Sequence, residues 1–299
     1  RRGALKTAKS PRRQTGGGRA ARTARRKISA GGADGRKKEK MILTADYHTH
    51  TPYSHGKNTV EENAEAAKAK GLKQIGITDH GFSHIFFGLR RKKVPALIAD
   101  CRAAEEKTGV KVLAGMEANI RGADGRTDIT PDVYDDFDLF VAGKHVMIAY
   151  DSFRDFRRYF WGNLIENKLK KGKNPPEKLV EYNTKAYIET IKNNPVDIIS
   201  HLGYLCPCDV KEVAKCARDY GTYIELNSKK THLSDEELFE AYDTGVRFVM
   251  DSDAHTASRV GDFALAEEQI KRVGLPTDRI DNIDGRLPSF RFAAFKAKR

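Results

Sequence analysis

Short runs of apolar and β-branched residues recur along the chain from Met41 onward, and segments with helical spacing separate them. Several runs, such as "DLFVAG" and "VRFVM", are apolar at nearly every position, which is typical of strands in a parallel sheet covered on both faces. Seven strands are therefore predicted, at residues 41–47, 74–79, 111–116, 138–143, 196–200, 222–227 and 246–250.

Two of the intervening segments carry clear helix signals. Thr59 and Glu62 have the spacing of a capping box, as do Ser234 and Glu237, and a glycine marks the end of each following helix. Seven strands that alternate with helices predict an α/β fold, and the length of residues 41–299 suits a β/α barrel. An open doubly wound sheet is the alternative.

Charge changes this picture only at the N-terminal end. Residues 1–40 carry 15 Lys or Arg and 2 acidic residues, so they hold the whole net charge of +13, while residues 41–299 hold 39 of each sign. The basic segment has almost no large apolar side chains, and we predict a disordered extension. A transit peptide or a nucleic-acid-binding arm are the alternatives for it. The balanced remainder offers no net basic field for polyanions.

The apolar stretches and the cysteines indicate where in the cell the protein is expected. No run approaches the ~20 apolar residues of a membrane span, so no membrane partner is expected. Four cysteines in a chain of this size form no disulfide framework, which favours free thiols and a cytoplasmic location. Cys206 and Cys208 follow a candidate ligand closely, and an accessory metal contact is the alternative for this pair.

Nine residues that can bind metal stand at or just after the predicted strand ends. Imidazole nitrogens and carboxylate oxygens are ligands of borderline divalent metals, and nine exceed what one ion can use. Because the carboxyl ends of barrel strands meet at one rim, we expect these side chains to converge around more than one metal. They are His48, His50, His55, His80, Glu117, His145, His201, Asp253 and His255.

The order of these motifs resembles that of the PHP (polymerase and histidinol phosphatase) family, in its free-standing phosphatase branch. The matching pieces are "DYHTH", "ITDH", "GMEAN", "AGKH", "ISHLG" and "SDAH", between Met41 and about Leu275. The resemblance implies a distorted, TIM-like seven-stranded β/α barrel with a trinuclear metal centre at its rim. Every ligand position of the family is filled. His55 follows His50 by five residues where some relatives use six, which affects only the path of that loop.

The resemblance also implies how three divalent ions, Zn, Mn or Fe, share the ligands. The first would take His48, His50, Glu117 and Asp253, the second Glu117 as a bridge with His145 and His201, and the third His55, His80 and His255. Closely spaced ions neutralise a phosphate ester, activate a hydroxide and stabilise the leaving alkoxide. The predicted function is therefore hydrolysis of a small phosphomonoester, with histidinol phosphate as one candidate. Glu117, Asp253 and His255 are the predicted catalytic residues.

Phosphate recognition also requires cations from the protein. Arg90 and Arg91 follow the second strand and Lys144 precedes His145, so all three are candidates. A solvated basic residue is the alternative for each. Asp79 and Asp251 are candidates to orient an imidazole, or simply to form hydrogen bonds at a strand end.

Residues 146–194 are too long for a simple return helix. The side chains of Phe153, Phe156, Phe160, Leu164 and Leu169 share one helical face, and a second helix is expected after Pro176. This helical insertion forms either a lid or wall at the site, or an extra helical pair on the exterior or in a dimer contact. His84 and His232 lie outside the ligand set. His84 is predicted to be a surface or packing residue, with protonation of a leaving group as the alternative, and His232 could line the pocket. The oligomeric state is open.

Two other functions compete with phosphomonoester hydrolysis. A phosphodiesterase or exonuclease is one, since PHP domains also process nucleic acid ends, although the neutral balance of residues 41–299 counts against long polyanions. The other is a nucleic-acid-binding or regulatory module with an inactive rim, in which the basic residues 1–40 make the contact.

Overall fold

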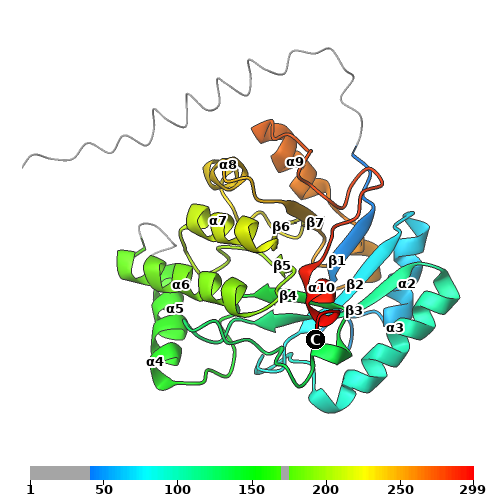
Figure 1. The fold of residues 1–299 in the computed structure, drawn as a ribbon, viewed down its shortest axis with the longest axis horizontal. Coiled ribbons are helices and arrows are strands. Elements are labelled where there is room, and N and C mark those ends of the chain that lie inside the picture. Colours follow the sequence, from blue (N-terminus) through cyan, green and yellow to red (C-terminus); the bar gives the residue numbers. More distant parts are fainter. Residues whose placement is uncertain (1–40, 170–174) are drawn as a thin grey trace, which may run out of the picture. The chain divides into compact units, whose positions relative to one another are not determined.

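The computed structural model describes residues 41–169 and 175–299, so the predicted basic extension lies outside the described residues. Seven parallel strands pair in chain order and form a nearly closed barrel with helices between them (Figure 1). The predicted seven-stranded barrel is confirmed, and each predicted run overlaps a strand. The strands are β1 (Ala45–Thr49), β2 (Gln74–His80), β3 (Lys111–Asn119), β4 (Leu139–Gly143), β5 (Ile198–Ile199), β6 (Tyr223–Asn227) and β7 (Phe248–Asp251).

Two of the helices between the strands begin where the capping-box signals predict. Thr59 and Glu62 form a capping box at the start of α2, and Ser234 and Glu237 form one at α8. The α-helices outside the insertion are α2 (Val60–Ala69), α3 (Val94–Thr108), α7 (Val210–Tyr220), α8 (Asp235–Asp243), α9 (Ala264–Val273) and α10 (Arg291–Lys296). Short 3₁₀ turns are η1 (Arg91–Lys93), η2 (Tyr134–Asp136) and η4 (Ala257–Arg259). None of the helices in the described ranges is long and apolar enough to cross a bilayer.

The predicted insertion is helical, but its first part is not one continuous α-helix. It consists of α4 (Phe153–Asp155), a π-helical segment η3 (Phe156–Gly162) and α5 (Asn163–Leu169), and α6 (Glu177–Asn193) follows Pro176 as predicted. The buried ring of Tyr159 lies 4.7 Å from that of Tyr182 on α6. The described contacts are those of a packed helical pair. A role beside the site stays a prediction.

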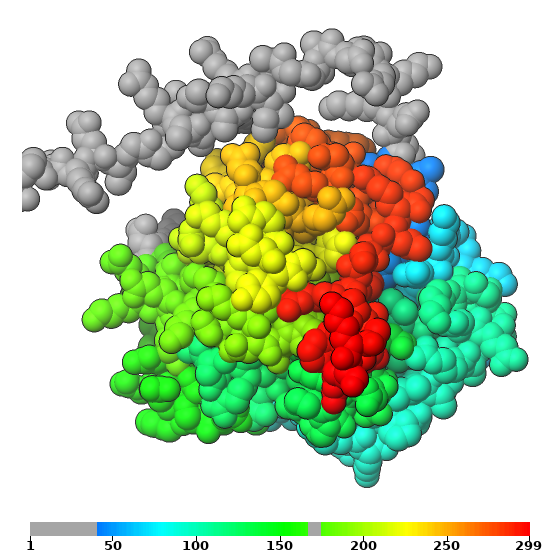
Figure 2. All heavy atoms as spheres, in the orientation of Figure 1, coloured from blue at the N-terminus to red at the C-terminus, as the bar shows by residue number. Residues whose placement is uncertain are grey.

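Side chains alternate between two cores along the strands. One set points outward and packs against the helices, and the other points inward and fills the interior of the barrel. The C-terminal segment covers this interior cluster, because the ring of Phe290 lies 4.8 Å from that of Tyr47. Figure 2 shows this segment (red) across the middle of the face in view. The buried interior residues are Ala45, Tyr47, Leu139, Val141, Ile198, Tyr223 and Val249.

The barrel closes between β1 and β7 largely through side chains. Thr49 and Ala254 form an isolated parallel bridge near the carboxyl ends. Nearer the amino end, the buried amide of Asn282 takes the place of strand pairing. Its Nδ2 donates to the carbonyls of Ala45 (2.8 Å) and Met250 (2.6 Å), and its Oδ1 accepts from the Met250 amide at 2.9 Å. Asn282 therefore joins the first strand to the last.

Replacement of the Asn282 side-chain amide should weaken the seam, that is, the junction between β1 and β7. We expect Asn282→Ala to lower the free energy of unfolding by about 2–4 kcal/mol, because it leaves buried backbone groups of both strands without partners. Urea unfolding followed by circular dichroism measures the change. Asn193→Ala, at an exposed asparagine of α6, is the control and should change stability by less than ~0.5 kcal/mol. Equal stability of the two variants would contradict the role given to Asn282.

Candidate metal centre

The nine candidate ligands converge at the carboxyl ends of the strands. Glu117 is fully buried at their centre, and its two carboxylate oxygens face different imidazoles. Oε1 lies 2.6 Å from His201 Nε2 and 3.4 Å from His145 Nε2. Oε2 lies 2.8 Å from His80 Nδ1 and 3.4 Å from His48 Nε2. One carboxylate thus stands between two groups of nitrogen donors.

The remaining candidates extend the cluster away from Glu117. His50 Nε2 lies 3.4 Å from Asp253 Oδ1, and the imidazole of His255 lies 4.3 Å from that of His50 and 4.2 Å from that of His55 between ring centroids. His55 in turn stacks on His80 at 4.8 Å. Donor atoms fall into three overlapping groups, each within 4.8 Å: His50, His80 and His255; His48, His50 and Glu117; His80, Glu117 and His145.

Two candidate ligands have a backbone conformation that residues other than glycine rarely adopt. His201 has φ of 30° and Asp253 has φ of 48°, both in the left-handed region. Such strain persists only where surrounding contacts impose it, and it concentrates at functional sites. The His201 amide donates to Glu225 Oε2 at 2.6 Å, and the chain after Asp253 is held by the bond from the Ala254 amide to the His48 carbonyl at 3.1 Å.

Close packing beside Glu117 explains a glycine at the end of β4. A Cβ atom on Gly143 would lie 2.4 Å from Ser200 Oγ and 2.8 Å from Glu117 Oε1. Ser200 Oγ itself donates to Glu117 Oε1 at 2.8 Å. Only a residue without a side chain leaves room for the carboxylate at this place.

Two residues that the sequence reasoning missed orient the imidazoles. Glu225 Oε1 accepts from His48 Nδ1 at 2.6 Å, and Asn119 Oδ1 accepts from His145 Nδ1 at 2.8 Å, so each ring keeps Nε2 towards Glu117. The signal for Glu225 was present in "YIELN", where a carboxylate interrupts an apolar strand as Glu117 does in "GMEAN". Glu225 follows the interior residue Tyr223 by two positions, which aims it into the barrel.

The cluster fits divalent ions by a structural criterion. Many of its buried donor atoms have no hydrogen-bond partner of acceptable geometry, and an unpartnered buried polar atom costs about 1–3 kcal/mol. Buried nitrogen and oxygen donor atoms that face one another and lack hydrogen-bond partners are an arrangement that cations satisfy. These atoms are His48 Nε2, His50 Nδ1 and Nε2, His55 Nδ1, His80 Nδ1, Glu117 Oε2 and His201 Nδ1.

Electrostatics favours the metal-binding form of some donors and the protonated form of others, since burial works to lower the pKa of His48 and His201 but the neighbouring Glu117 raises both. Burial works to raise the pKa of Glu117, but the neighbouring imidazoles of His145, His48 and His201 hold it well below its usual range. Burial and the neighbouring His80 and His255 lower the pKa of His55 to about 3. The carboxylate is therefore ionised and the His55 imidazole neutral at neutral pH, as metal coordination requires.

The three predicted phosphate cations do not contact the cluster among the described interactions. Lys144 is buried on the outward side of β4, where its Nζ donates to the Ile120 carbonyl at 3.0 Å and lies 3.4 Å from the ring centre of Tyr159. Burial lowers its pKa to about 8. Arg91 pairs with Asp132 at 2.9 Å, and Arg90 is exposed. Their role in phosphate binding stays a prediction.

A different lysine reaches the cluster. Lys229, just after β6, places its Nζ 3.2 Å from Asp253 Oδ1 and 3.2 Å from His255 Nδ1. Its side chain is 46% exposed, so the ammonium group stands at the boundary between the ligands and solvent. Sequence reasoning missed it because "NSKKTH" is a basic run with two adjacent lysines, and only the fold shows which one points inward.

Four further residues named from the sequence have defined places. His84 stacks on His80 at 5.0 Å and His232 lies 5.8 Å from His201 between ring centroids, so both line the edge of the cluster. Asp79 accepts from the Thr51 amide at 2.8 Å, and Asp251 accepts from the Tyr47 amide at 2.7 Å. Both aspartates thus form strand-end hydrogen bonds, the second of the two roles predicted for them.

The cysteine pair does not approach the ligands in the described contacts. Cys206 is buried and Cys208 partly buried, both as free thiols, and burial raises the pKa of Cys206 to about 12. A thiol that stays protonated is a poor metal ligand. The free-thiol interpretation is the one these surroundings favour.

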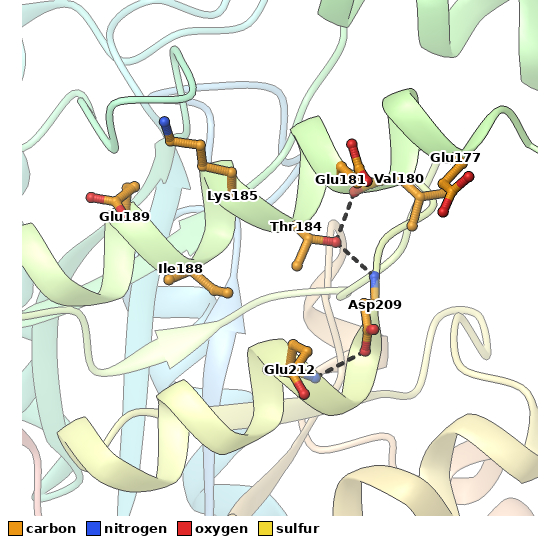
Figure 3. A pocket seen from close by; sticks show the side chains of 9 residues that line it. All are labelled: Glu177, Val180, Glu181, Thr184, Lys185, Ile188, Glu189, Asp209 and Glu212. Carbon is orange, nitrogen blue, oxygen red and sulfur yellow. Dashed lines mark hydrogen bonds between the residues drawn. The ribbon is translucent and has the colours of Figure 1, made fainter.

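An open groove between α6 and α7 is separate from the candidate ligands. It has a volume of about 580 Å³, and Figure 3 shows the nine side chains that line it. Five of the nine are acidic and one, Lys185, is basic. Asp209 is engaged in capping α7, where it accepts from the Glu212 amide at 3.0 Å. None of the nine candidate ligands lines the groove, which therefore adds nothing to the metal centre.

Comparisons with known sequences agree on one family. The model of the PHP domain matches residues 46–229. A probable phosphatase of Thermoanaerobacter sp. (strain X514) is 32% identical over 259 residues, which cover 82% of this chain and 92% of the relative. A probable phosphatase of Caldanaerobacter subterraneus subsp. tengcongensis is 33% identical over 258 residues, which cover 81% and 88%.

A solved structure shares the fold. Histidinol phosphate phosphatase from Lactococcus lactis, determined with zinc, L-histidinol and phosphate, superposes with a TM-score of 0.52. The match covers 78% of this chain and 95% of that protein at 17% sequence identity. At this identity the likeness supports the seven-stranded barrel and not the details of the site.

Removal of the Glu225 carboxylate should weaken metal binding without unfolding the barrel. We expect Glu225→Ala to bind zinc ~10–100-fold more weakly, because His48 loses the acceptor that orients it and the strained His201 loses its anchor. Competition against a chelating dye measures the affinity, and circular dichroism checks the fold. Glu225→Gln keeps one acceptor oxygen and replaces the other with an NH2 donor, so it should fall between wild type and Glu225→Ala. Unchanged zinc affinity in Glu225→Ala would show that orientation by this residue is unimportant.

Proposed function

This chain belongs to the PHP domain family, and from that membership we propose that it is a metal-dependent phosphomonoesterase for a small phosphorylated metabolite. Its curated relatives are named probable phosphatases. The observation that carries the proposal is the set of buried, unpartnered imidazole nitrogens around Glu117. A barrel has no structural need for such a cluster, since an apolar interior is more stable than unpaired polar atoms.

We propose three divalent ions, held as the family resemblance implies. His48, His50 and Asp253 would hold one together with Glu117, which would also contribute to the ion held by His145 and His201. His55, His80 and His255 would hold the third. Support comes from the two oxygens of the Glu117 carboxylate, since Oε1 lies 2.6 Å from His201 Nε2 and Oε2 lies 3.4 Å from His48 Nε2. Oε2 also lies 2.8 Å from His80 Nδ1, so the third group of donors adjoins the same carboxylate. Zn, Mn and Fe all suit this mixture of imidazole and carboxylate.

Bound divalent ions would supply positive charge to the phosphate and acidify a water molecule, which removes the need for a side-chain nucleophile. The protein's own residues do the positioning. Glu117 keeps the two groups of donors at a fixed separation. Glu225 and Asn119 accept the Nδ1 protons of His48 and His145, so that Nε2 of each ring is the coordinating atom.

Lys229 is the proposed protein contact to the phosphate. Its ammonium group and a divalent ion cannot both occupy the space beside Asp253 Oδ1 and His255 Nδ1, because like charges repel. With ions bound, this half-exposed side chain would leave the ligands, and a phosphate oxygen at the rim would offer it a charge-assisted hydrogen bond. Arg90, Arg91 and Lys144 remain alternatives.

Histidinol phosphate is one candidate substrate. The support is the fold shared with the histidinol phosphate phosphatase of Lactococcus lactis. Residues 41–299 have no net charge, which favours a small ester over a long polyanion. A cytoplasmic location, where small phosphorylated metabolites occur, is part of the same proposal.

Glu117→Gln should separate catalysis from folding. We expect this variant to lose at least one equivalent of metal and at least ~100-fold in kcat/KM on histidinol phosphate or another phosphomonoester, because a neutral amide bridges two cations poorly. Elemental analysis, release of inorganic phosphate with and without a chelator, and circular dichroism measure the three properties.

Glu106→Gln, at an exposed position of α3, is the matched control and should behave as wild type. Hydrolysis by Glu117→Gln at the parent rate would rule out the bridge. Release of mononucleotides from single-stranded DNA, without any phosphomonoesterase activity, would instead favour a phosphodiesterase.

Lys229→Met should impair substrate binding more than metal binding. We expect KM for the phosphomonoester to rise ~10-fold or more, from loss of one charge-assisted hydrogen bond, with the metal content unchanged. Steady-state kinetics and elemental analysis test this, with Lys230→Met, at the adjacent exposed lysine, as control. If metal content rather than KM changed, Lys229 would be a support for the ligands and not a phosphate contact.

A further inference from the structure

The loop after β2 carries apolar side chains that the fold leaves in solvent at the rim of the candidate centre. Ile85, Phe86 and Phe87 are 58%, 66% and 44% exposed, and Met147, after β4, is 38% exposed. Apolar side chains that cluster on an exposed surface mark a site of interaction more often than scattered ones do. We call these four residues the apolar lip.

Hydrogen bonds hold the loop in place. The Ile85 amide donates to the Met147 carbonyl at 3.0 Å, next to the antiparallel bridge between His84 and Ile148. Residues opposite one another in such a pair project to the same side, so Ile85 and Met147 share a face. The amide and hydroxyl of Ser83 donate to Asp128 at 3.0 and 3.1 Å. The lip is therefore a preorganised surface.

The lip is continuous with the metal centre. The ring of Phe87 stacks on His55, with centroids 4.6 Å apart and an interplanar angle of 26°, and Phe86 lies 6.1 Å further out. Polar groups lie at the same rim, since Lys229 Nζ is 3.2 Å from His255 Nδ1 and the His255 ring lies 4.2 Å from that of His55. Apolar Phe87 and cationic Lys229 thus flank the same pair of imidazoles.

We propose that the apolar lip binds the organic part of the phosphate ester, so that the substrates are esters of alcohols with an aromatic or other apolar group. This inference rests on the proposed phosphomonoesterase function. In an ester whose phosphate contacts the ions and Lys229, the alcohol group is bonded through oxygen to the same phosphorus and so lies at this rim, where Phe87 stacks on His55 and Phe86 lies beside Phe87. An apolar group there removes exposed apolar surface from water, whereas a polyol there would lose hydration without replacement partners.

Two alkyl esters of the same charge test the preference. 2-Phenylethyl phosphate presents an aromatic group, and glycerol 3-phosphate presents hydroxyls with a comparable leaving group. We expect the metal-loaded wild type to favour the phenylethyl ester at least ~10-fold in kcat/KM, and Phe86→Ser to reduce this ratio ~5-fold or more. Phe86→Leu should retain most of the preference. Ile42→Ser replaces a 67% exposed apolar residue just before β1, at the other end of the barrel, and should leave the ratio unchanged.

Calorimetry with non-hydrolysable phosphonates distinguishes failure of the lip from failure of the proposed function. Tighter binding of 2-phenylethylphosphonate than of 2-hydroxyethylphosphonate, lost in Phe86→Ser, supports the lip even if neither ester is hydrolysed. Hydrolysis of both esters at equal kcat/KM, or a ratio unchanged in Phe86→Ser, overturns the lip and leaves the function standing. Equal or absent binding of the two phosphonates also overturns it.

A lipid surface is the other occupant that an apolar loop next to basic residues could have. Co-sedimentation with vesicles of phosphatidylcholine and phosphatidylserine tests it. Vesicle binding by wild type that Phe86→Ser abolishes, together with no preference between the esters, would overturn the proposal in favour of membrane contact.

Discussion

The arrangement of the candidate site depends on one buried carboxylate. Glu117 is fully enclosed and lies within 3.5 Å of four imidazole nitrogens. An ionised carboxylate in such a place is tolerated only because positive or polar partners surround it. The imidazoles in turn have buried nitrogens that lack partners, so neither set is satisfied by the other alone. The barrel must supply enough stability from its cores to hold this arrangement ready for cations.

The contacts that close the barrel also bring the candidate ligands together. The seam between β1 and β7 is joined by Asn282 at its amino half and by side chains of Asp46 and Asp251 beside the ligands. Asp46 Oδ1 accepts from the Ser252 amide at 3.1 Å, one residue before Asp253. Ligands that lie about 200 residues apart in sequence, such as His48 and Asp253, are brought together by these bonds. A weak seam would therefore separate the two halves of the cluster.

Local sequence was enough to predict the elements. Strand positions followed from apolar runs and helix starts from capping boxes such as Thr59 with Glu62, because those signals act over a few residues. The broken helix of the insertion was missed, since a π-helical segment between α4 and α5 has the same apolar spacing as a continuous helix. The nine candidate ligands were identified because strand ends of a β/α barrel share one rim.

Contacts between distant segments decided what sequence could not. Lys144 and Lys229 are both lysines near strand ends, yet one is buried against Tyr159 outside the sheet and the other points at Asp253. Glu225 stood out in the sequence only as a carboxylate within an apolar strand, and the fold showed that its partner is His48. Sequence alone determined the elements, the ligand types and their common rim, because these depend on chemical identity and local periodicity. Only the tertiary structure decided which charged groups contact one another. The energy of a charge depends on its neighbours and its burial, and a short stretch of sequence specifies neither.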